Sequence, residues 1–330
     1  MAFVQEYYSG AVLLSLQPNC LRTPYQVTSK QHYDPPMPLL ELSSQSDLSG
    51  QDSASVTATV SPVLPEPAQL IHAVTSLMQD VAARELMPRF KHVVAERKHD
   101  GSIVTEADRM VEAALAEALP RIFDCPVLGE EMIETAQKQI WRDADWCWCV
   151  DPLDGTANFA SGKRYFGMSV ALMYRRKSVC GVVLDPNTGE VFHAVQGGGA
   201  FLDSKRLKLL PAKHLHDAHV EVGRYKRLGR LGTTLLAHKP FRKLTMSGAS
   251  VLQWSHMACG RVDAFLHAGE QPWDYAAGAL ILEEAGGRIA SLQHDDYWRP
   301  DHPQEWSKSV IAARHPALFD EWKRWVRSHL

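Results

Sequence analysis

The chain has 330 residues, of which 45% are hydrophobic, and a formal net charge of -3 at pH 7. This is enough apolar material for one sizeable core or two fused subdomains. The near balance of charge gives no basic footprint for nucleic acid, and no apolar run is long enough for a transmembrane helix. Six cysteines without a Cys-x-x-Cys pair fit a reducing compartment. We therefore expect a cytoplasmic protein that acts on a small diffusible molecule.

The first 67 residues differ in composition from the rest of the chain. Residues 1–67 are rich in Ser, Gln, Pro and Thr and carry no sustained helical or strand period, which predicts a disordered extension. The folded domain is predicted over residues 68–330, with one half over about 68–200 and the other over about 201–330. Deletion of the extension should therefore leave the activity of the folded domain unchanged.

Two amphipathic helices are predicted at the start of the folded domain. The first begins at Ala68 and continues towards Leu86, because apolar residues recur at helical spacing: Leu70, Ile71, Val74, Leu77, Met78 and Val81. The second begins at Thr105, where Thr105-Glu-Ala-Asp108 resembles a capping box, and Pro120 is expected to close it. Its predicted buried stripe is Met110, Val111, Ala114, Leu115, Ala118 and Leu119.

Apolar runs after the second helix predict buried strands over 127–128 and 146–150, each with acidic residues at its carboxyl end. Period-two spacing places Cys147 and Cys149 on one face of the latter strand, where core packing is favoured over metal binding. A last helix is expected over about 273–285. A meander with a tight turn is expected over 167–174, 178–184 and 191–195. Mixed strands and helices of this kind predict a layered α/β architecture.

Three acidic clusters stand beside apolar strands or at a helix start, where an unpaired carboxylate would be costly to desolvate. They are Glu130-Glu131, Asp151 with Asp154, and Asp274. Carboxylates that converge in a fold repel one another and need protons or a cation, and hard oxygen ligands favour Mg²⁺. The sequence therefore predicts a magnesium site shared by these clusters.

The segment Asp151-Pro-Leu-Asp154-Gly-Thr156 adds a candidate phosphate site to the metal site. Gly155, Thr156 and Ala157 can open a helix whose free backbone N–H groups would bind phosphate. Pro152 would stiffen the turn between the two aspartates, and Gly155 would let the backbone approach a ligand closely. The alternative is a plain strand-to-helix turn with Asp154 as its cap.

A histidine cluster and a basic patch could each be functional or simply belong to the solvent-exposed surface. The clustered histidines at 214, 216 and 219 could bind a metal, but they lie in a polar stretch that is typical of solvated surface. Arg224, Lys226 and Arg227 form a basic patch, which would either contact a second phosphate of a substrate or belong to a solvated loop.

Several short motifs are spaced along the chain. The main ones are Gly129-Glu-Glu131, Trp148-Cys-Val-Asp151-Pro-Leu-Asp154-Gly-Thr-Ala-Asn-Phe159, and Trp273-Asp274-Tyr-Ala-Ala-Gly278 followed by Glu284-Ala-Gly-Gly287. Val104-Thr-Glu-Ala-Asp108 and Gly197-Gly-Gly-Ala-Phe201 accompany them. Together these motifs resemble the inositol monophosphatase family, from Ala68 to about Ala313. The resemblance implies a five-layer αβαβα sandwich of the inositol monophosphatase and fructose 1,6-bisphosphatase type.

The resemblance also implies a set of metal ligands. Glu130, Asp151 and the backbone carbonyl of Leu153 would bind one Mg²⁺. A second ion would be bound by Asp151, Asp154 and Asp274. Glu130 would help to hold a third, weaker ion, so that two or three ions are expected per site.

Catalytic and substrate-binding residues are implied in the same way. Asp108 and Thr156 match the family's pair that positions and deprotonates a metal-bound water, and Glu130 belongs to the same catalytic set. The cap of the second helix remains a compatible role for Asp108. Contacts to substrate or phosphate are implied for Asp154, Gly155, Thr156, Ala249, His267 and Asp274.

The reaction implied is hydrolysis of a small phosphate monoester, by in-line attack of a metal-activated water and without a phosphoenzyme. Haloacid-dehalogenase-type phosphatases also place Asp-Gly-Thr after an apolar strand, but they use Asp-x-Asp-Gly-Thr with a nucleophilic first aspartate. Two residues separate Asp151 from Asp154 here, which would misplace the nucleophile and the acid. Capture of an aspartyl-phosphate would reverse this interpretation.

One position departs from the inositol-specific pattern. Such members usually carry a glutamate seven residues before the metal-binding aspartate, and His267 stands there in this chain. A histidine, which can also be cationic, suits a different hydroxyl pattern or an additional negative group, or it only fills the wall of the site. Ala157-Asn158-Phe159 resembles the inositol branch. Inositol 1-phosphate or a related polyol or sugar phosphate is therefore favoured over histidinol phosphate, 3′-phosphoadenosine 5′-phosphate and fructose 1,6-bisphosphate.

The resemblance further implies inhibition by lithium and a homodimer. A regulatory protein that keeps this fold chiefly to bind a macromolecular partner is the alternative of a different class. Such a role would leave every catalytic motif in place, so the motifs alone do not separate the two hypotheses.

Overall fold

The computed structural model of the protein describes residues 64–98, 101–298 and 308–330. The disordered extension predicted over residues 1–67 lies outside this described part, except for its last residues, and stays a prediction. Among the described helices, none combines the length and the apolar character that crossing a membrane requires.

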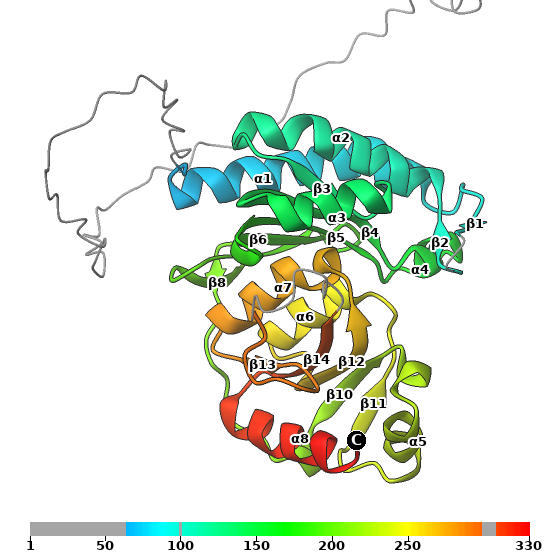
Figure 1. The fold of residues 1–330 in the computed structure, drawn as a ribbon, viewed down its shortest axis with the longest axis vertical. Helices are drawn as coiled ribbons and strands as arrows, with labels where there is room; N and C mark the ends of the chain where they lie inside the picture. Colours follow the sequence, from blue (N-terminus) through cyan, green and yellow to red (C-terminus); the bar gives the residue numbers. More distant parts are fainter. Residues whose placement is uncertain (1–63, 99–100, 299–307) are drawn as a thin grey trace, which may run out of the picture. The chain divides into compact units, whose positions relative to one another are not determined.

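Helices and strands alternate in five layers (Figure 1). Helices α1 (Pro67–Val81) and α2 (Glu106–Ile122) cover one face of a seven-stranded sheet. Helices α6 (Ser250–Ala258) and α7 (Pro272–Glu284) lie between this sheet and a five-stranded one. Helices α5 (Arg230–Ala237) and α8 (Pro316–Ser328) cover the outer face of the second sheet. The predicted αβαβα sandwich is thus confirmed.

The large sheet has the order β3-β4-β5-β6-β7-β8-β9, with β3 and β4 parallel and the later neighbours antiparallel. Its strands are β3 (Val127–Gly129), β4 (Trp146–Asp154), β5 (Gly167–Tyr174), β6 (Lys177–Asp185), β7 (Glu190–Val195), β8 (Gly199–Leu202) and β9 (Lys205–Arg206). The predicted meander is β5, β6 and β7. Cys147 and Cys149 face the core between the sheets, while Trp148 and Val150 face α1 and α2, as the spacing predicts.

The small sheet has the order β11-β10-β12-β14-β13, in which β10 is parallel to both β11 and β12. Its strands are β10 (His219–Gly223), β11 (Lys243–Thr245), β12 (Ala264–Glu270), β13 (Arg288–Ala290) and β14 (Lys308–Ala313). Parallel strands end at the same edge of a sheet. Gly223 therefore pairs with His267 at the edge from which β12 leads into α7.

The remaining elements are short and lie mostly on the connections. They are the hairpin of β1 (Glu96–Arg97) and β2 (Ile103–Val104), helices α3 (Glu134–Asp143) and α4 (Thr156–Ala160), a π-helical turn η1 (Ala82–Leu86), and the 3-10 turns η2 (Met87–Arg89), η3 (Leu215–Asp217) and η4 (Tyr225–Leu228).

Helix α2 confirms the predicted start and corrects the predicted end. The Thr105 N–H donates to Asp108 Oδ2 at 2.7 Å, and Thr105 Oγ1 accepts the N–H of Ala107 at 3.2 Å, which completes the cap. Pro120 does not close the helix, which continues to Ile122, because a proline in the last turn removes only its own N–H from the helical hydrogen bonds. The predicted stripe is also wrong at one position, since Met110 is exposed.

Two other predictions stopped short of the observed elements. The helix predicted over 273–285 is α7, but α8 follows it, with Leu318, Phe319, Trp322 and Val326 buried at helical spacing. Strand β4 does not end at residue 150 but continues through the segment expected to be a turn, as far as Asp154. Its pairing with β5 shifts in register between Asp151 and Asp154.

Candidate metal and phosphate site

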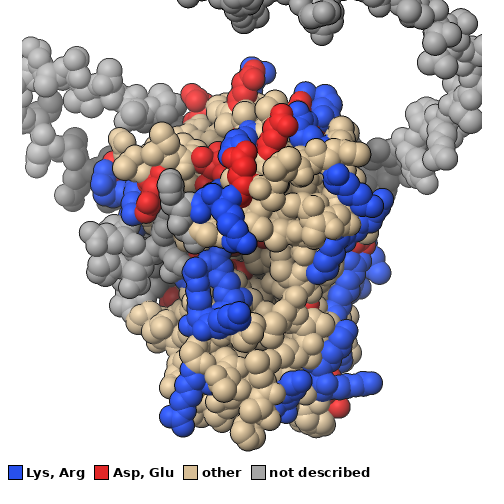
Figure 2. Space-filling view, turned by 90° about the vertical axis from the view of Figure 1, so that its right-hand side faces the viewer, with Lys and Arg blue, Asp and Glu red and all other residues tan. Residues whose placement is uncertain are grey.

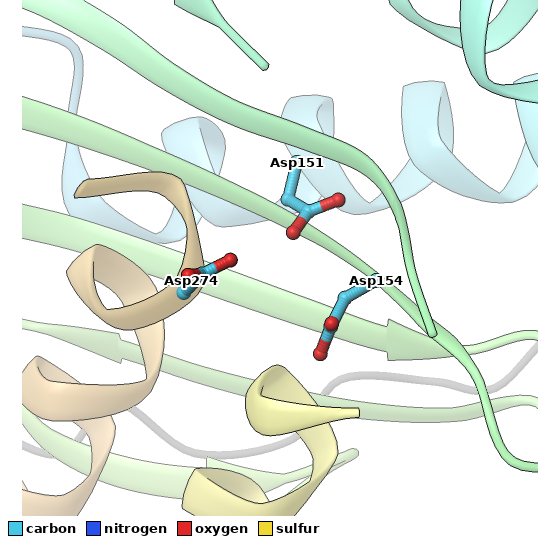
Figure 3. Close-up of side chains that lie close together, drawn as sticks. All are labelled: Asp151, Asp154 and Asp274. Atoms are coloured by element: carbon cyan, nitrogen blue, oxygen red, sulfur yellow. The ribbon is translucent and has the colours of Figure 1, made fainter. Parts of the chain in front are cut away.

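Three aspartates converge at the end of β4 (Figure 3). Asp151 and Asp154 lie on either side of the register shift in β4, and Asp274 lies in the first turn of α7. One oxygen from each carboxylate lies within 4.8 Å of the other two. Within the described ranges, no other group of three His, Cys, Asp or Glu side chains has this geometry, and the histidines at 214, 216 and 219 do not form one.

Burial raises the pKa of each carboxyl group in this cluster, and repulsion by neighbouring carboxylates adds to the rise at Asp151 and Asp154. Burial, with the nearby charges of Glu130 and Asp154, holds the pKa of Asp151 well above its usual range. Burial, followed by the charge of Asp274, raises the pKa of Asp154 to about 8. The pKa of Asp274 is raised to about 6, chiefly by burial. Carboxylates that oppose one another's ionisation in this way are stabilised by a bound cation.

The oxygen atoms of the cluster fit Mg²⁺. Asp151 Oδ1 accepts the N–H of Leu153 at 3.0 Å, whereas Asp151 Oδ2 is buried and has no hydrogen-bond partner among the described residues. A buried carboxylate oxygen without a donor is costly unless a cation meets it. Mg²⁺ prefers carboxylate and carbonyl oxygens, so Asp151, Asp154 and Asp274 are suitable ligands.

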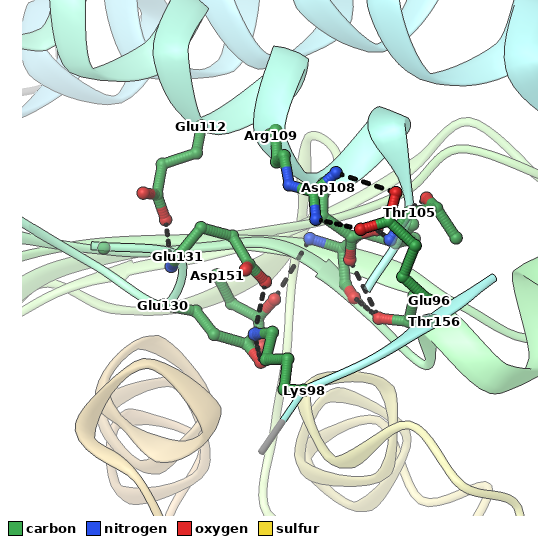
Figure 4. A network of polar contacts seen from close by, with 12 residues as sticks. Glu96, Lys98, Thr105, Asp108, Arg109, Glu112, Glu130, Glu131, Asp151 and Thr156 are labelled. Atoms are coloured by element: carbon green, nitrogen blue, oxygen red, sulfur yellow. Dashed lines mark hydrogen bonds and ion pairs between the residues drawn. The ribbon is translucent and has the colours of Figure 1, made fainter. Parts of the chain in front are cut away.

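Glu130 lies near Asp151 (Figure 4) but does not belong to the group of three aspartates. Its Oε1 lies 3.3 Å from the ammonium of Lys98, which also pairs with Glu131 at 2.7 Å. Burial raises the pKa of Glu130 to about 8, and Lys98 opposes this rise. A cationic side chain thus contacts the carboxylate that the family resemblance assigns as a metal ligand, so that Lys98 and a metal ion would compete for Glu130.

Asp108 and Thr156 meet from different elements, as expected from their implied pairing. Thr156 Oγ1 donates to Asp108 Oδ1 at 2.9 Å, and the carbonyl of Leu153 lies 3.0 Å from the same hydroxyl. The other oxygen of Asp108 accepts the N–H and the hydroxyl of Thr105, at 2.7 and 2.6 Å. Burial raises the pKa of Asp108, while these hydrogen bonds oppose the rise. The network holds Asp108 in one orientation.

The helix expected after Gly155 is α4, which spans only five residues. Its few aligned peptides make a weak dipole, so its free N–H groups add little beyond ordinary hydrogen bonds. Gly155 has a left-handed φ of 88°, and an added Cβ would lie 3.0 Å from both the Cβ of Ala249 and the carbonyl oxygen of Tyr165. Close packing within the protein therefore favours glycine at position 155, and the approach of its backbone to a ligand stays a prediction.

A pocket of about 380 Å³ opens beside Asp154 and Asp274. Ala249 and His267, both expected to contact substrate, lie in its wall, together with Val222, Gly223, Arg224, Tyr225, Met246, Gly248, Ser250 and Gln253. A larger cavity, of about 510 Å³, lies between α1 and the strands β7 and β8, and none of the predicted site residues lines it. The smaller pocket is therefore the candidate substrate site.

His267 is neutral in this pocket, not cationic as one interpretation of the sequence allowed. Burial and the positive charges of Arg224 and Arg227 lower the pKa of His267 to about 3. Its Nδ1 accepts the N–H of Gly269 at 3.3 Å. In a neutral imidazole the other nitrogen then carries the proton, so His267 Nε2 is a hydrogen-bond donor.

Two buried glutamates that support the site were missed in the sequence. Glu112 Oε2 accepts the N–H of Glu131 at 2.7 Å and so holds the turn after β3. Glu221 accepts hydrogen bonds from Thr245 and Ser247, both at 2.6 Å, and holds the segment that leads to Ala249. Both could have been noticed as acidic residues inside otherwise apolar stretches of a helix and a strand.

A third missed glutamate lies close to the aspartates. Glu270 is fully buried, four residues before Asp274, and its Oε2 accepts the indole N–H of Trp254 at 3.1 Å. Burial, with the charge of Asp274, raises the pKa of Glu270 well above its usual range. Its other oxygen has no hydrogen-bond partner among the described residues.

The fold and the site together define a five-layer αβαβα protein with a candidate metal centre at the end of a central strand. The model of the inositol monophosphatase family matches residues 66–326, and the chain belongs to this family.

Known proteins of this family resemble the chain over most of their length. Inositol monophosphatase 2 of Solanum lycopersicum is 37% identical over 210 residues, which are 60% of this chain and 77% of that protein. Nus factor SuhB of Pseudomonas aeruginosa is 35% identical over 217 residues, 62% of this chain and 78% of that protein. The solved structure of an IMPase from Thermotoga maritima has a TM-score of 0.67 and 28% identity, and the match covers 78% of this chain and 96% of that one.

Proposed function

We propose that the protein is a Mg²⁺-dependent phosphatase that hydrolyses a small phosphate monoester. The observation that carries this proposal is the convergence of Asp151, Asp154 and Asp274 next to the hydrogen-bonded pair of Thr156 and Asp108. A metal-type carboxylate cluster, a proton acceptor and an adjoining pocket are the parts that phosphoryl transfer to water requires.

The residues of the chain suit direct attack of water on phosphorus. Thr156 Oγ1 accepts a proton from the attacking water while its own proton passes to Asp108 Oδ1, 2.9 Å away. The bond from water oxygen to phosphorus forms as the bond from phosphorus to the alcohol oxygen breaks, and the alkoxide takes a proton from solvent. Mg²⁺ held by the aspartates, with Glu130 and the carbonyl of Leu153 nearby, would supply charge that neutralises the phosphate and acidifies the water.

We also propose inositol 1-phosphate or a related polyol or sugar phosphate as the substrate. The similarity to inositol monophosphatase 2 supports this substrate. His267 argues against it, because inositol-specific members usually carry a glutamate at this position. Histidinol phosphate, 3′-phosphoadenosine 5′-phosphate and fructose 1,6-bisphosphate are the alternatives. A cytoplasmic homodimer that Li⁺ inhibits remains our proposal for the assembled protein, and light scattering after gel filtration checks its mass.

Release of inorganic phosphate with Mg²⁺ tests the function. We expect release from at least one of the four esters, a fall on chelation of Mg²⁺, and inhibition by Li⁺. Phosphate release from none of them would contradict the proposal.

The similarity to proteins named Nus factor SuhB keeps partner binding as a second candidate function. Capture of partners by the wild type and by Asp274→Asn distinguishes the two functions. Two results together would favour partner binding. The wild type would show no phosphatase activity, and the Asp274→Asn variant would still bind its partner.

A further inference from the structure

We propose that the pocket beside the aspartates recognises a second anionic group, phosphate or carboxylate, on the part of the substrate that leaves as the alcohol. The inference rests on the proposed phosphatase function, and among the esters considered above it favours 3′-phosphoadenosine 5′-phosphate and fructose 1,6-bisphosphate over inositol 1-phosphate, which has no second anionic group. The carrying observation is a row of basic side chains that leads away from the candidate metal site.

A second hollow, of about 360 Å³, adjoins the pocket and is lined in part by residues of the segment between β1 and β2. The two share Arg224 and Tyr225, and the hollow is also lined by Gly101, Ser102, Lys226 and Arg227. Figure 2 views the face of the molecule that carries this hairpin and α5, and it shows basic side chains bordering a central depression. A ligand that starts at the aspartates therefore extends towards positive charge.

Arg224, Lys226 and Arg227 are exposed cations, two of them in η4 and one directly before it. In the described ranges, none of the three lies within ion-pair distance of an aspartate or glutamate. Three neighbouring cations that repel one another and form no direct ion pair with the protein are suitable for binding an anionic ligand.

The backbone delivers Arg224 to the pocket in an unusual conformation. Its φ is 46°, in the left-handed region that residues other than glycine rarely adopt. The preceding residue, Gly223, pairs with His267 across the sheet, and a Cβ on Gly223 would collide with the His267 ring. Arg224 lines the same pocket as Asp154 and Asp274, and its positive charge opposes the burial that raises the pKa of both carboxyl groups.

His267 adds a donor where the inositol-specific pattern has an acceptor. Nδ1 accepts the N–H of Gly269, so Nε2 donates, and the ring lines the pocket beside Arg224. A glutamate in this place would accept hydrogen bonds from hydroxyl groups and repel an anion. A neutral imidazole donor next to a guanidinium instead complements the oxygens of a phosphate or carboxylate.

A competing explanation is that Arg224 serves only the scissile phosphate or neutralises the aspartates. Lys226 and Arg227 argue against it, because they line the outer hollow and not the pocket beside the aspartates. The two explanations predict different effects of Arg224 on esters with and without a second anionic group. A cation for the scissile phosphate aids every ester equally, whereas one for a second anion aids only esters that have it.

Matched substrate pairs separate these explanations. We would measure kcat/KM with Mg²⁺ for fructose 1-phosphate against fructose 1,6-bisphosphate, and for adenosine 3′-phosphate against 3′-phosphoadenosine 5′-phosphate. The variants are Arg224→Asn, since Asn tolerates the left-handed conformation, Arg224→Lys, which keeps the charge, and Arg227→Ala. Arg230→Ala is the control, because Arg230 is exposed nearby but lines neither hollow.

The wild type should prefer the doubly anionic member of a pair. Arg224→Asn should lower kcat/KM for that member by about 10- to 100-fold, and for its partner by less than about 3-fold, while Arg224→Lys recovers part of the loss and Arg230→Ala changes neither. Equal losses of kcat/KM on both members of a pair, or no preference in the wild type, overturn the inference.

If no ester is hydrolysed, the proposed function fails. Calorimetric binding of the same pairs to Asp108→Asn protein then decides the inference separately: it stands if the doubly anionic member binds more tightly through Arg224, and falls if the pair binds equally.

Discussion

Asp274 combines a structural and a chemical role in a single side chain. Its Oδ2 accepts the N–H of Gln271 at 2.8 Å and so caps α7, while its carboxylate completes the aspartate cluster. An asparagine keeps an oxygen for the cap but removes the charge. The two roles can therefore be separated by one substitution.

We predict that Asp274→Asn lowers kcat by more than about 100-fold, because changes even in the outer shell of a metal site cost 10- to 100-fold. The metal-free variant should unfold at the same temperature as the metal-free wild type or higher, since one of three repelling carboxylates is gone. Phosphate release and thermal unfolding measure the two effects. Near-normal turnover would refute the role of Asp274, and Asp143→Asn, at an exposed site, is the control.

Thr156 is predicted to move a proton through its hydroxyl group. Thr156→Ala should lower kcat by about 100-fold or more, the usual contribution of general acid–base catalysis, whereas Thr156→Ser keeps the hydroxyl 2.9 Å from Asp108 and should retain most activity. Stopped assays of phosphate release at saturating substrate measure both. If the serine variant is as slow as the alanine variant, the proton relay is wrong.

At the scale of elements, glycines set how closely the central helices approach their neighbours. Gly181 on β6 faces α7, where an added Cβ would lie 2.8 Å from the Cα of Ala277. Glu284, at the end of α7, accepts the N–H groups of Gly197 and Gly199, both at 2.7 Å. The Glu-Ala-Gly-Gly and Gly-Gly-Gly-Ala-Phe motifs thus meet for a structural reason.

Gly278 gives a test of this packing. An added Cβ would collide with the side chain of Trp254 on α6, so Gly278→Ala should destabilise the fold by about 1–3 kcal/mol, as overpacking of a core does. Gly198→Ala is the control, because its Cβ would meet no atom closer than 3.2 Å. Urea denaturation of both variants measures the difference. Equal stability of the two would show that the layers can shift apart without cost.

At the scale of the whole molecule, the acidic cluster couples stability to pH and to metal. The pKa values of Glu130 and Asp154 are raised to about 8 and that of Asp274 to about 6, from ordinary values of about 4. A carboxyl group whose pKa is raised by folding binds its proton more tightly in the native state. Its contribution to stability is fully present below pH about 4 and is lost as pH rises through the raised pKa.

We therefore predict that the metal-free protein loses stability as the pH rises from about 4 to about 8. Mg²⁺ at 100 times its Kd should restore about 2.7 kcal/mol at pH 8, and less at pH 6, where protons compete for the carboxylates. Thermal unfolding with a chelator and with Mg²⁺, at both pH values, measures this. A metal effect that does not grow with pH would contradict the prediction, and Asp274→Asn should weaken the dependence.

Local patterns predicted the elements whose signals are themselves local. The Thr105 cap, the first helix and the meander depend on neighbours within a few residues, so their positions agree with the structure. The predictions at Pro120 and Met110 were wrong, because a proline is tolerated in the last turn of a helix and because Met110 is exposed rather than buried. Helix α8 was overlooked although Leu318, Phe319, Trp322 and Val326 carry its period.

The sequence by itself determined the family, the layered fold and the acidic residues that make up the candidate metal site. Only the tertiary structure decided which of them meet: Asp151, Asp154 and Asp274 converge, whereas Glu130 is paired with Lys98. It also decided that His267 is a neutral donor beside Arg224. Distances between remote residues, burial and the charges around a side chain arise only when the layers pack, and these quantities set its pKa and its hydrogen bonds.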